Sequence, residues 1–359
     1  MRAIMIMFDT LSRNYLSNYG NAKEDTPNFQ WLAKKMTTFD QFYGGSMPCM
    51  LARRELHTGR YNFMHRMWGQ LEPFDHSIFE IMQKNNIYCH LVTDHSHYFE
   101  DGGATYHNRY STWQGFRGQE GDRWLPRKLG ENLNNTNVLN KTGISVKQHF
   151  SNRAKQLTEE TMSSTKMVKA GLEFLETYHT EDDWFLQIEC FDPHEPFYIP
   201  SKEQSHAYFW PKYGRVTDEI TENDLAELKR EYKALIKICD KNLGKLLDYI
   251  DKNNMWKDTL IIVNTDHGIL LGEHGWLGKN VAPMYEEVIH LPFFISSPNS
   301  IKGNRCKVLS QTIDIPATLL DYFGIKNDLE MDGKSLLPIL KNHRKHFTQR
   351  LFLERMVDM

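Results

Sequence analysis

The chain has 359 residues, of which 40% are hydrophobic and 25% charged, and its formal net charge is -3. This balance is typical of an ordinary globular protein. It excludes a bulk attraction to nucleic acid or to acidic membranes, so we expect neither as a partner. The length exceeds that of an average domain, but large α/β folds reach it around a single sheet. We therefore expect one large core with an appendage.

Short apolar runs alternate along the chain with segments of helical periodicity. The runs are apolar on both faces and are separated by helices, so they predict a sheet that is covered on both sides. This is the α/β class, with a large, mainly parallel or mixed sheet sandwiched by helices. The first run is too short for a signal sequence or a membrane span. The expected strands are residues 3–8, 88–93, 184–190, 259–265 and 291–296.

Two helices between these strands have clear boundaries. One begins within "TPNFQWLAKKM", where Thr26 is the expected N-cap and Pro27 the first helical residue. The other spans residues 224–253 and carries a long apolar stripe at helical spacing. Residues 115–164 are polar and weakly periodic, which is typical of an insertion over a functional site.

The cysteines are odd in number and widely spaced, and no two of them form a CxxC pair. This pattern predicts neither a disulfide framework nor a thiolate zinc site, and it favours a reducing, cytoplasmic location. The five are Cys49, Cys89, Cys190, Cys239 and Cys306.

Acidic residues and histidines follow four of the expected strands. In open α/β sheets, ligands bind outside the carboxyl ends of the strands, where loops converge and helix N-termini point. Each residue has a structural alternative, because an aspartate can cap a helix and a histidine can complete a turn. Together, however, they would desolvate each other at one edge unless a cation or an anionic substrate compensated them, which favours a metal site. The residues are Asp9, His95, His97, His194, Asp266 and His267.

The segment "SMPCMLARRELHTGR" (46–60) places Cys49 where a helix is expected to begin. At a helix N-terminus a nucleophile feels the positive end of the dipole, and the guanidinium of Arg53 lowers the cost of its anionic form. The alternative is that Cys49 is a small buried hydrophobe. We favour the nucleophile.

Six blocks stand in order along the chain: "FDTLSRNYLSNYG", "TPNFQWLAKKMTTFDQFYGGSMPCMLARRELHTGR", "FDPHEPF", "TDHGILLGEHGWLGKN", "YEEVIHLPFFI" and "DIPATLLDYFGI". Together they span nearly the whole chain and resemble the sulfatase branch of the alkaline phosphatase superfamily. The resemblance implies a metal-dependent hydrolase of a small-molecule sulfate ester, with residues 1–340 as its catalytic α/β domain. It also implies that residues 341–359 begin a C-terminal subdomain that is short or absent here.

In sulfatases the cysteine of a C-x-P-x-R signature is oxidised after synthesis to formylglycine. One hydroxyl of the hydrated aldehyde attacks sulfur, and the other later expels sulfate. The resemblance places Cys49 in this role, with Arg53 as the signature arginine. Leu51 stands where the signature usually has proline or sometimes alanine. We therefore expect Leu51 to impair recognition by the formylglycine-generating maturation enzyme.

The resemblance also implies a metal site. Asp9, Asp266 and His267 would bind one divalent ion, and the oxygen on residue 49 would complete the shell. Hard carboxylate oxygens suit calcium, magnesium or manganese, and the single imidazole tilts the choice from calcium towards manganese.

Four further residues match family positions around the sulfuryl group. His194 would lie near the leaving-group oxygen, and Lys279 would bind the sulfuryl oxygens. His95 and His97 stand where sulfatases have a Lys-x-His pair. A histidine in place of lysine at position 95 weakens the fixed positive charge there.

Thr10 and His267 depart from the Asp-Asp and Asp-Asn pairs of many sulfatases and resemble the phosphonate monoester hydrolase and phosphodiesterase side of the superfamily. A second hypothesis is therefore a hydrolase of those esters with the same site. A third is a catalytically silent binding protein, because Leu51 would block maturation. We favour the sulfatase, since a protein without activity has little reason to keep all the ligands. Side chains of residues 99–124 are expected to line the substrate pocket.

Overall fold

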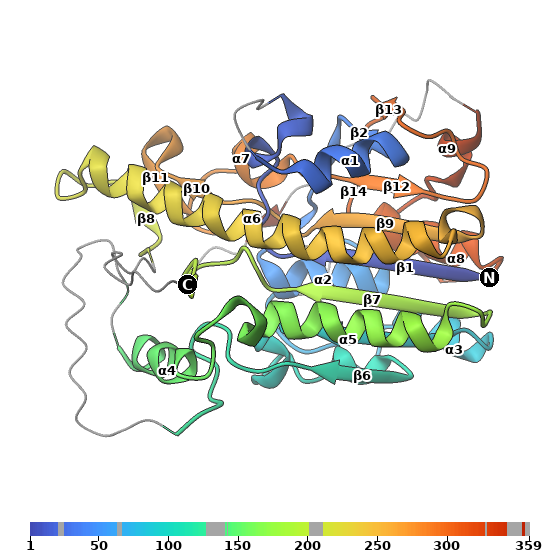
Figure 1. Cartoon of the computed structure of the whole chain (residues 1–359), viewed down its shortest axis with the longest axis horizontal. Coiled ribbons are helices and arrows are strands. Elements are labelled where there is room, and N and C mark those ends of the chain that lie inside the picture. The colour runs from blue at the N-terminus through green and yellow to red at the C-terminus, as the bar shows by residue number, and fades with distance from the viewer. Residues whose placement is uncertain are drawn as a thin grey trace.

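The computed structural model describes residues 1–20, 25–62, 67–126, 141, 143–200, 211–326, 329–342 and 354–355. Most of the segment 341–359, in which we expect a subdomain to begin, lies outside the described residues, as does part of the polar segment 115–164. The described residues form a layered α/β structure in which helices cover both faces of one large sheet (Figure 1).

The large sheet contains eight of the described strands. Their bounds are β1 Arg2–Phe8, β2 Thr37–Phe39, β5 Tyr88–Thr93, β6 Thr112–Gly115, β7 Trp184–Cys190, β9 Thr259–Thr265, β12 Phe294–Ser296 and β13 Arg305–Cys306. The strand order is β13-β2-β12-β9-β1-β7-β5-β6. The five strands from β9 to β6 are parallel, whereas β12 is antiparallel to both neighbours. The sheet is therefore mixed and mainly parallel, which confirms the fold class.

Shorter strands form small sheets beside the large one, in the orders β10-β11-β8, β14-β3 and β15-β4. The last of these places β15 parallel to β4, the strand that ends just before Cys49. Their bounds are β3 Phe42–Tyr43, β4 Ser46–Met47, β8 Gly214–Arg215, β10 Leu270–Leu271, β11 Trp276–Gly278, β14 Ser310–Gln311 and β15 Glu354–Arg355.

The helices lie in two layers that follow the alternation of side chains in β1. Ile4, Ile6 and Phe8 point into one apolar cluster with α1, α5 and α6, and the intervening residues point into a second cluster with α2, α3, α8 and α9. A central strand that is apolar on both faces is thus packed on both. The α-helix bounds are α1 Pro27–Lys35, α2 Cys49–Thr58, α3 Ile78–Lys84, α4 Ile144–Arg153, α5 Ser163–Tyr178, α6 Glu222–Lys252, α7 Glu286–Ile289, α8 Asp314–Tyr322 and α9 Leu337–Asn342.

The N-terminus of α1 is capped by a residue from another helix. Thr26 occupies the expected N-cap position, but its side chain makes no capping hydrogen bond and instead accepts from the Ser17 N–H at 3.1 Å. The N–H groups of Asn28 and Phe29 donate to the carboxylate of Asp240 in α6 at 3.1 and 2.9 Å. The buried carboxylate satisfies two donors at once and ties the two helices together.

The register of the central strands aligns their carboxyl ends. Phe8, the last residue of β1, pairs with Cys190 of β7 and Thr265 of β9. The chain therefore leaves all three strands at the same height, and Asp9 and Asp266 emerge side by side at one edge of the sheet.

No helix in the described part of the chain is both long enough and apolar enough to cross a membrane. The 31-residue helix α6 is amphipathic, with one face in the core. All five cysteines are buried free thiols.

Candidate active site and metal centre

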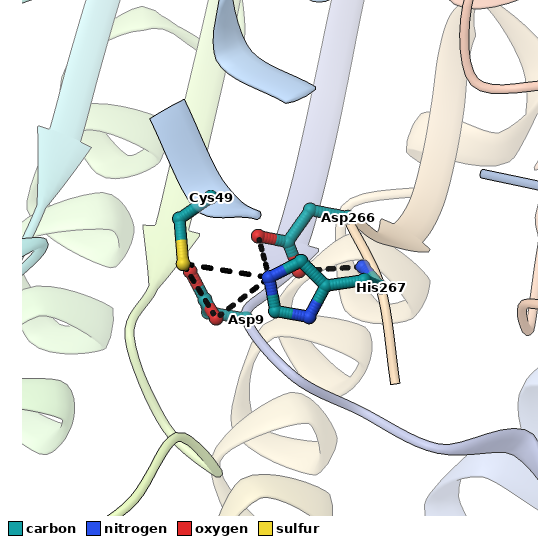
Figure 2. A group of neighbouring side chains, drawn as sticks. All are labelled: Asp9, Cys49, Asp266 and His267. Carbon is teal, nitrogen blue, oxygen red and sulfur yellow. Dashed lines mark hydrogen bonds and ion pairs between the residues drawn. The ribbon is translucent and has the colours of Figure 1, made fainter. Parts of the chain in front are cut away.

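Four buried side chains converge at the carboxyl edge of the sheet (Figure 2). Asp9 follows β1, Asp266 and His267 follow β9, and Cys49 is the first residue of α2. One ligand atom from each of the four lies within 4.8 Å of the others. His267 Nε2 lies 3.4 Å from both Cys49 Sγ and Asp266 Oδ2, and Asp9 Oδ1 lies 3.7 Å from the sulfur. The structure thus brings together the residues expected to hold a metal.

The hydrogen bonds of His267 set its tautomer. Nδ1 lies 3.1 Å from the carbonyl oxygen of Gly268, which can only accept, so Nδ1 carries the proton and the lone pair of Nε2 faces the cluster. Burial lowers the pKa of His267 despite the opposing charge of Asp266, which favours the neutral imidazole. A neutral imidazole held at one nitrogen by a backbone carbonyl is the usual state of a metal-binding histidine.

Arg53 is fully buried and pairs with three carboxylates. Its guanidinium lies 3.0 Å from Asp9 Oδ2 and 3.0 Å from Glu189 Oε1, and it also contacts Asp266. Burial raises the pKa of Asp9, but the charge of Arg53 and other nearby cations outweigh burial, so this pKa lies well below its usual value. One guanidinium therefore faces an excess of buried negative charge, and a divalent cation would offset the remainder.

The cluster fits a hard divalent cation, provided that residue 49 offers an oxygen. Ligand atoms at about 2.0–2.6 Å from one ion lie roughly 3–5 Å from each other, as the atoms of this cluster do. Burial, followed by the charge of Asp9, raises the pKa of the Cys49 thiol well above its usual value. Arg53 lowers this pKa, as expected, but burial and the charge of Asp9 outweigh it, so the protonated thiol is favoured. A neutral thiol is a poor ligand beside two carboxylates, whereas an oxygen there completes a hard donor set.

Lys279 and His194 meet beside the cluster. Lys279 Nζ donates to Thr10 Oγ1 at 2.9 Å and to His194 Nε2 at 2.7 Å, and it lies 3.5 Å from Glu195 Oε2. Burial lowers the pKa of Lys279, but Glu195 and other nearby acidic groups outweigh burial and raise it. The ammonium group is thus a fixed positive charge, and Thr10 connects it to Asp9, whose Oδ1 accepts from the Thr10 hydroxyl at 2.6 Å.

His95 and His97 occupy different environments. His95 is fully buried, with Nε2 3.2 Å from Asp9 Oδ2, and burial lowers its pKa well below the usual value. His97 Nδ1 lies 2.9 Å from Glu100 Oε2, and its Nε2 lies 3.5 Å from Glu120 Oε2. Burial lowers the pKa of His97, but the two glutamates outweigh it and raise this pKa. His95 therefore contacts Asp9, one of the four candidate metal ligands. His97 is more exposed to solvent than His95.

Besides Glu100, which lies beside His97, three glutamates contact the predicted site residues without being predicted themselves. Glu189 lies inside β7, and an ionisable residue within a buried strand is a signal that it has a charged partner. Glu195 directly follows His194, so its proximity can be read from the sequence. Glu120 comes from the polar segment that is expected to lie over the site, but nothing in the sequence distinguishes it from the other residues of that segment.

Asp94 and Asp192 form a buried carboxyl pair beside these residues. Gln119 Nε2 donates to Asp94 Oδ2 at 2.8 Å and to Asp192 Oδ1 at 3.1 Å, and the Phe191 N–H donates to Asp94 Oδ1 at 2.7 Å. Burial and the charge of Asp192 raise the pKa of Asp94 to about 7. The pair joins the ends of β5 and β7 to the polar segment.

This pair is expected to make the folded protein less stable as the pH rises from about 4 to about 7. Asp94 keeps its proton in the folded chain over this range, while the same carboxyl in the unfolded chain loses it, so a higher pH favours unfolding. Asp192→Asn removes the like charge and keeps the acceptor for Gln119. Thermal unfolding should then show a smaller decrease in Tm across this range than the wild type shows. Asp218→Asn, at an exposed position, is the control, and equal slopes in wild type and Asp192→Asn would contradict the prediction.

Comparison with known proteins agrees with this geometry. The family model described as Sulfatase matches residues 2–325. The arylsulfatase of Clostridium perfringens is 23% identical over 381 residues, which cover 94% of this chain and 78% of that protein. The choline-sulfatase of Rhizobium meliloti is 24% identical, with 94% and 71% covered. The N-acetylglucosamine-6-O-sulfatase of Bacteroides thetaiotaomicron is 38% identical over 117 residues, which cover 32% of this chain and 21% of that protein.

Solved structures share the fold. The phosphonate monoester hydrolase of Agrobacterium radiobacter has a TM-score of 0.72 at 19% identity, covering 95% of this chain and 77% of that one. A protein in complex with its substrate D-glucosamine-2-N,6-O-disulfate has a TM-score of 0.72 at 17% identity, covering 95% and 80%. The family model extends over the central sheet and over every converging residue from Asp9 to Lys279, and this chain belongs to the sulfatase family.

Proposed function

We propose that the chain hydrolyses sulfate esters of small molecules, with one divalent metal ion and with residue 49 as the nucleophile. The observation that carries the proposal is the meeting of Asp9, Cys49, Asp266 and His267 in one buried cluster, to which Thr10 connects the ammonium group of Lys279. A buried set of anionic donors beside a fixed positive charge suits a cation together with an anionic ester. Similarity to an arylsulfatase and a choline-sulfatase supports the same reaction.

Each residue of the site has a role in this proposal. Asp9, Asp266 and His267 hold the cation, which when bound supplies Lewis-acid activation of the nucleophile and neutralises an ester oxygen. Lys279 binds a sulfuryl oxygen. His194 gives a proton to the leaving-group oxygen, since an imidazole is suited to proton transfer near neutral pH. Arg53 keeps the carboxylates of Asp9 and Asp266 ionised and oriented.

Formylglycine at residue 49 would supply a hydroxyl that attacks sulfur and a second hydroxyl that releases sulfate. The neutral, buried thiol of Cys49 supports this proposal, because the unmodified side chain is a poor nucleophile and a poor ligand here. Calcium, magnesium and manganese all suit the donors, with the imidazole favouring manganese. The formylglycine-generating enzyme is then a partner, and the unpaired cysteines support a cytoplasmic location.

A second candidate is the hydrolysis of phosphonate monoesters or phosphodiesters in the same site. Thr10 and His267 support it, as does the similarity of fold to the Agrobacterium enzyme. These esters, like sulfate monoesters, carry one negative charge, whereas a phosphate monoester carries close to two. Among the described residues around the cluster, Arg53 and Lys279 are fixed cations, while burial lowers the pKa of His95 and favours its neutral form. This balance suits a monoanion.

Four substrates decide between the candidates: nitrophenyl sulfate, bis-nitrophenyl phosphate, a phenyl phosphonate ester and nitrophenyl phosphate. We expect metal-loaded protein to give its highest kcat/KM with nitrophenyl sulfate. A preference for the second or third substrate would favour the second candidate, and a preference for the dianionic monoester would refute the charge argument. Absence of turnover with all four, in protein whose residue 49 is fully converted, would contradict both candidates.

Leu51 is expected to limit the conversion of Cys49. Leu51 is buried in the first turn of α2, and its N–H donates to the Pro48 carbonyl oxygen at 3.0 Å, so Leu51→Ala keeps this hydrogen bond and Leu51→Pro removes it. Both variants restore a residue found in the maturation signature. We expect both to raise the fraction of formylglycine in protein made in a foreign host, measured by the mass of the peptide 46–60. Equal, full conversion of wild type and both variants would show that Leu51 is harmless.

A further inference from the structure

Glu120 lies between two histidines on the open side of the site. Its Oε1 is 3.6 Å from His194 Nδ1, and its Oε2 is 3.5 Å from His97 Nε2. The side chain of His194 is 3% exposed, whereas those of Glu120 and His97 are 13% and 17% exposed. The carboxylate therefore stands where the buried site meets solvent. None of the roles given above uses it.

A buried network holds Glu120 in this position. The neighbouring Gln119 donates to Asp94 and Asp192 and accepts from Arg153 Nη2 at 3.2 Å. Glu120 itself has a φ of 43°, in the left-handed region that is unfavourable for a residue with a Cβ. Such a conformation persists only where its surroundings enforce it, and it is concentrated at functional sites. The polar segment is thus docked so that one particular carboxylate reaches the histidines.

The hydrogen bonds of His194 show that Glu120 does not share a metal with it. Glu120, His194 and Glu195 have the spacing of a cation site. However, His194 Nδ1 lies 2.7 Å from the Glu195 carbonyl oxygen and so carries a proton, and Nε2 accepts from Lys279. Neither nitrogen offers a lone pair towards the two carboxylates. Instead, Glu120 Oε1 and Glu195 Oε2 lie 3.6 and 3.4 Å from the protonated Nδ1.

We propose that Glu120 is a positioning residue for the reaction and acts through His194. This inference rests on the proposed function, in which His194 is the proton donor. In the free site Nε2 accepts from Lys279, so His194 becomes doubly protonated only after Lys279 has turned to a sulfuryl oxygen and Nε2 has taken a proton from water. When the bond from sulfur to the leaving-group oxygen then breaks, its electron pair stays on that oxygen, which takes this proton from Nε2. His194 is left neutral with its proton on Nδ1. A carboxylate beside Nδ1 stabilises the doubly protonated form and orients the ring, which is the role of the aspartate in a Ser-His-Asp triad.

This role predicts that the effect of Glu120 depends on the leaving group. A phenol of low pKa departs without a proton, whereas one of high pKa needs it, so loss of acid assistance slows the second more. Glu120→Gln keeps the shape of the side chain and removes its charge. Glu100→Gln is the matched control, because it removes a charge 2.9 Å from His97 Nδ1 and leaves the neighbours of His194 in place.

The test measures kcat/KM with a series of substituted phenyl sulfates. For Glu120→Gln, the loss with the least acidic phenol is expected to exceed the loss with nitrophenyl sulfate by at least about tenfold. Glu100→Gln is expected to show the same factor across the series. An equal loss across the series for Glu120→Gln would overturn the proposal, because a purely structural role slows all substrates alike.

A second measurement does not depend on turnover. Nitrogen-15 NMR of labelled histidine in the metal-loaded protein follows the two ring nitrogens of His194. The charged groups around this imidazole are Asp9, Glu120, Asp192, Glu195 and Lys279. Glu120→Gln is expected to change the chemical shift of Nδ1, because the carboxylate beside that N–H is lost, and Glu100→Gln to leave it unchanged. If no ester is hydrolysed, the proposed function fails, and an unchanged Nδ1 signal in Glu120→Gln overturns the role of Glu120 independently.

Discussion

Asp266→Ala is expected to lower kcat/KM by at least about a thousandfold and to abolish tight metal binding, because loss of a metal ligand removes several kcal/mol of transition-state stabilisation. Asp266 follows β9 at the edge of the sheet and not in its core, so the variant should still fold. Metal content after dialysis, measured by plasma mass spectrometry, gives a readout that is separate from activity. A full equivalent of tightly bound metal in this variant would contradict the ligand set.

Two further variants separate the loss of the ligand from a loss of structure. Asp266→Asn keeps an oxygen to accept from the N–H groups of Thr10 and His267, at 3.1 and 2.8 Å, but lacks the charge, so it should also lose the metal. Asp258→Ala lies beside the opposite end of β9, where the 51% exposed carboxylate pairs with Arg2 at 2.5 Å. It should keep both metal and activity, since exposed ion pairs contribute about 1 kcal/mol or less.

Cys49→Ala is expected to abolish turnover, with a loss of at least about 10⁴-fold, because the covalent step then lacks its nucleophile. The metal ligands Asp9, Asp266 and His267 remain, so the variant should still bind the cation, although more weakly. Activity and metal content measured on the same sample distinguish the two effects. Turnover close to that of the wild type would contradict the role of residue 49.

Cys49→Ser tests the second hydroxyl. Serine provides one hydroxyl for attack on sulfur but none to expel sulfate, so we expect a single turnover that leaves sulfate attached to the protein, detectable by intact mass. The control is Cys89→Ala, since Cys89 is buried in β5 within the second apolar cluster and its loss should affect stability more than activity. Steady multiple turnover by Cys49→Ser would contradict the two-hydroxyl mechanism.

The central strands could be predicted from the sequence because their burial is two-sided. The runs 88–93, 184–190 and 259–265 match β5, β7 and β9, since a strand packed on both faces reads as a continuous apolar segment. The run 291–296 was less informative. Only Phe294–Ser296 forms a strand, and it is antiparallel, a property that local composition does not encode. The residue that caps α1 could not be predicted from the sequence either, because Asp240 lies 212 residues from Asn28 along the chain.

The site could be predicted as far as it follows the strand ends. Asp9 and Asp266 come directly after strands, and His95 and His194 follow strands within four residues, so a parallel sheet must bring them to one edge. The direction of the pKa shift of Cys49 could not be predicted from the strand ends. It depends on burial and on the carboxylate of Asp9, which lies 40 residues away along the chain. The roles of these residues stay predictions until variants are measured.

The shared register of β1, β7 and β9 separates changes that the site tolerates from changes that it does not. A deletion of one residue within β1 would move Asp9 by about 3.3 Å and turn its side chain to the other face of the sheet. A change of length in a connecting loop, by contrast, leaves the ladder and its aligned ends in place. The loops that would recognise the organic part of a substrate can therefore change in evolution while the candidate metal ligands keep their positions. Substrate range and metal chemistry can then evolve separately.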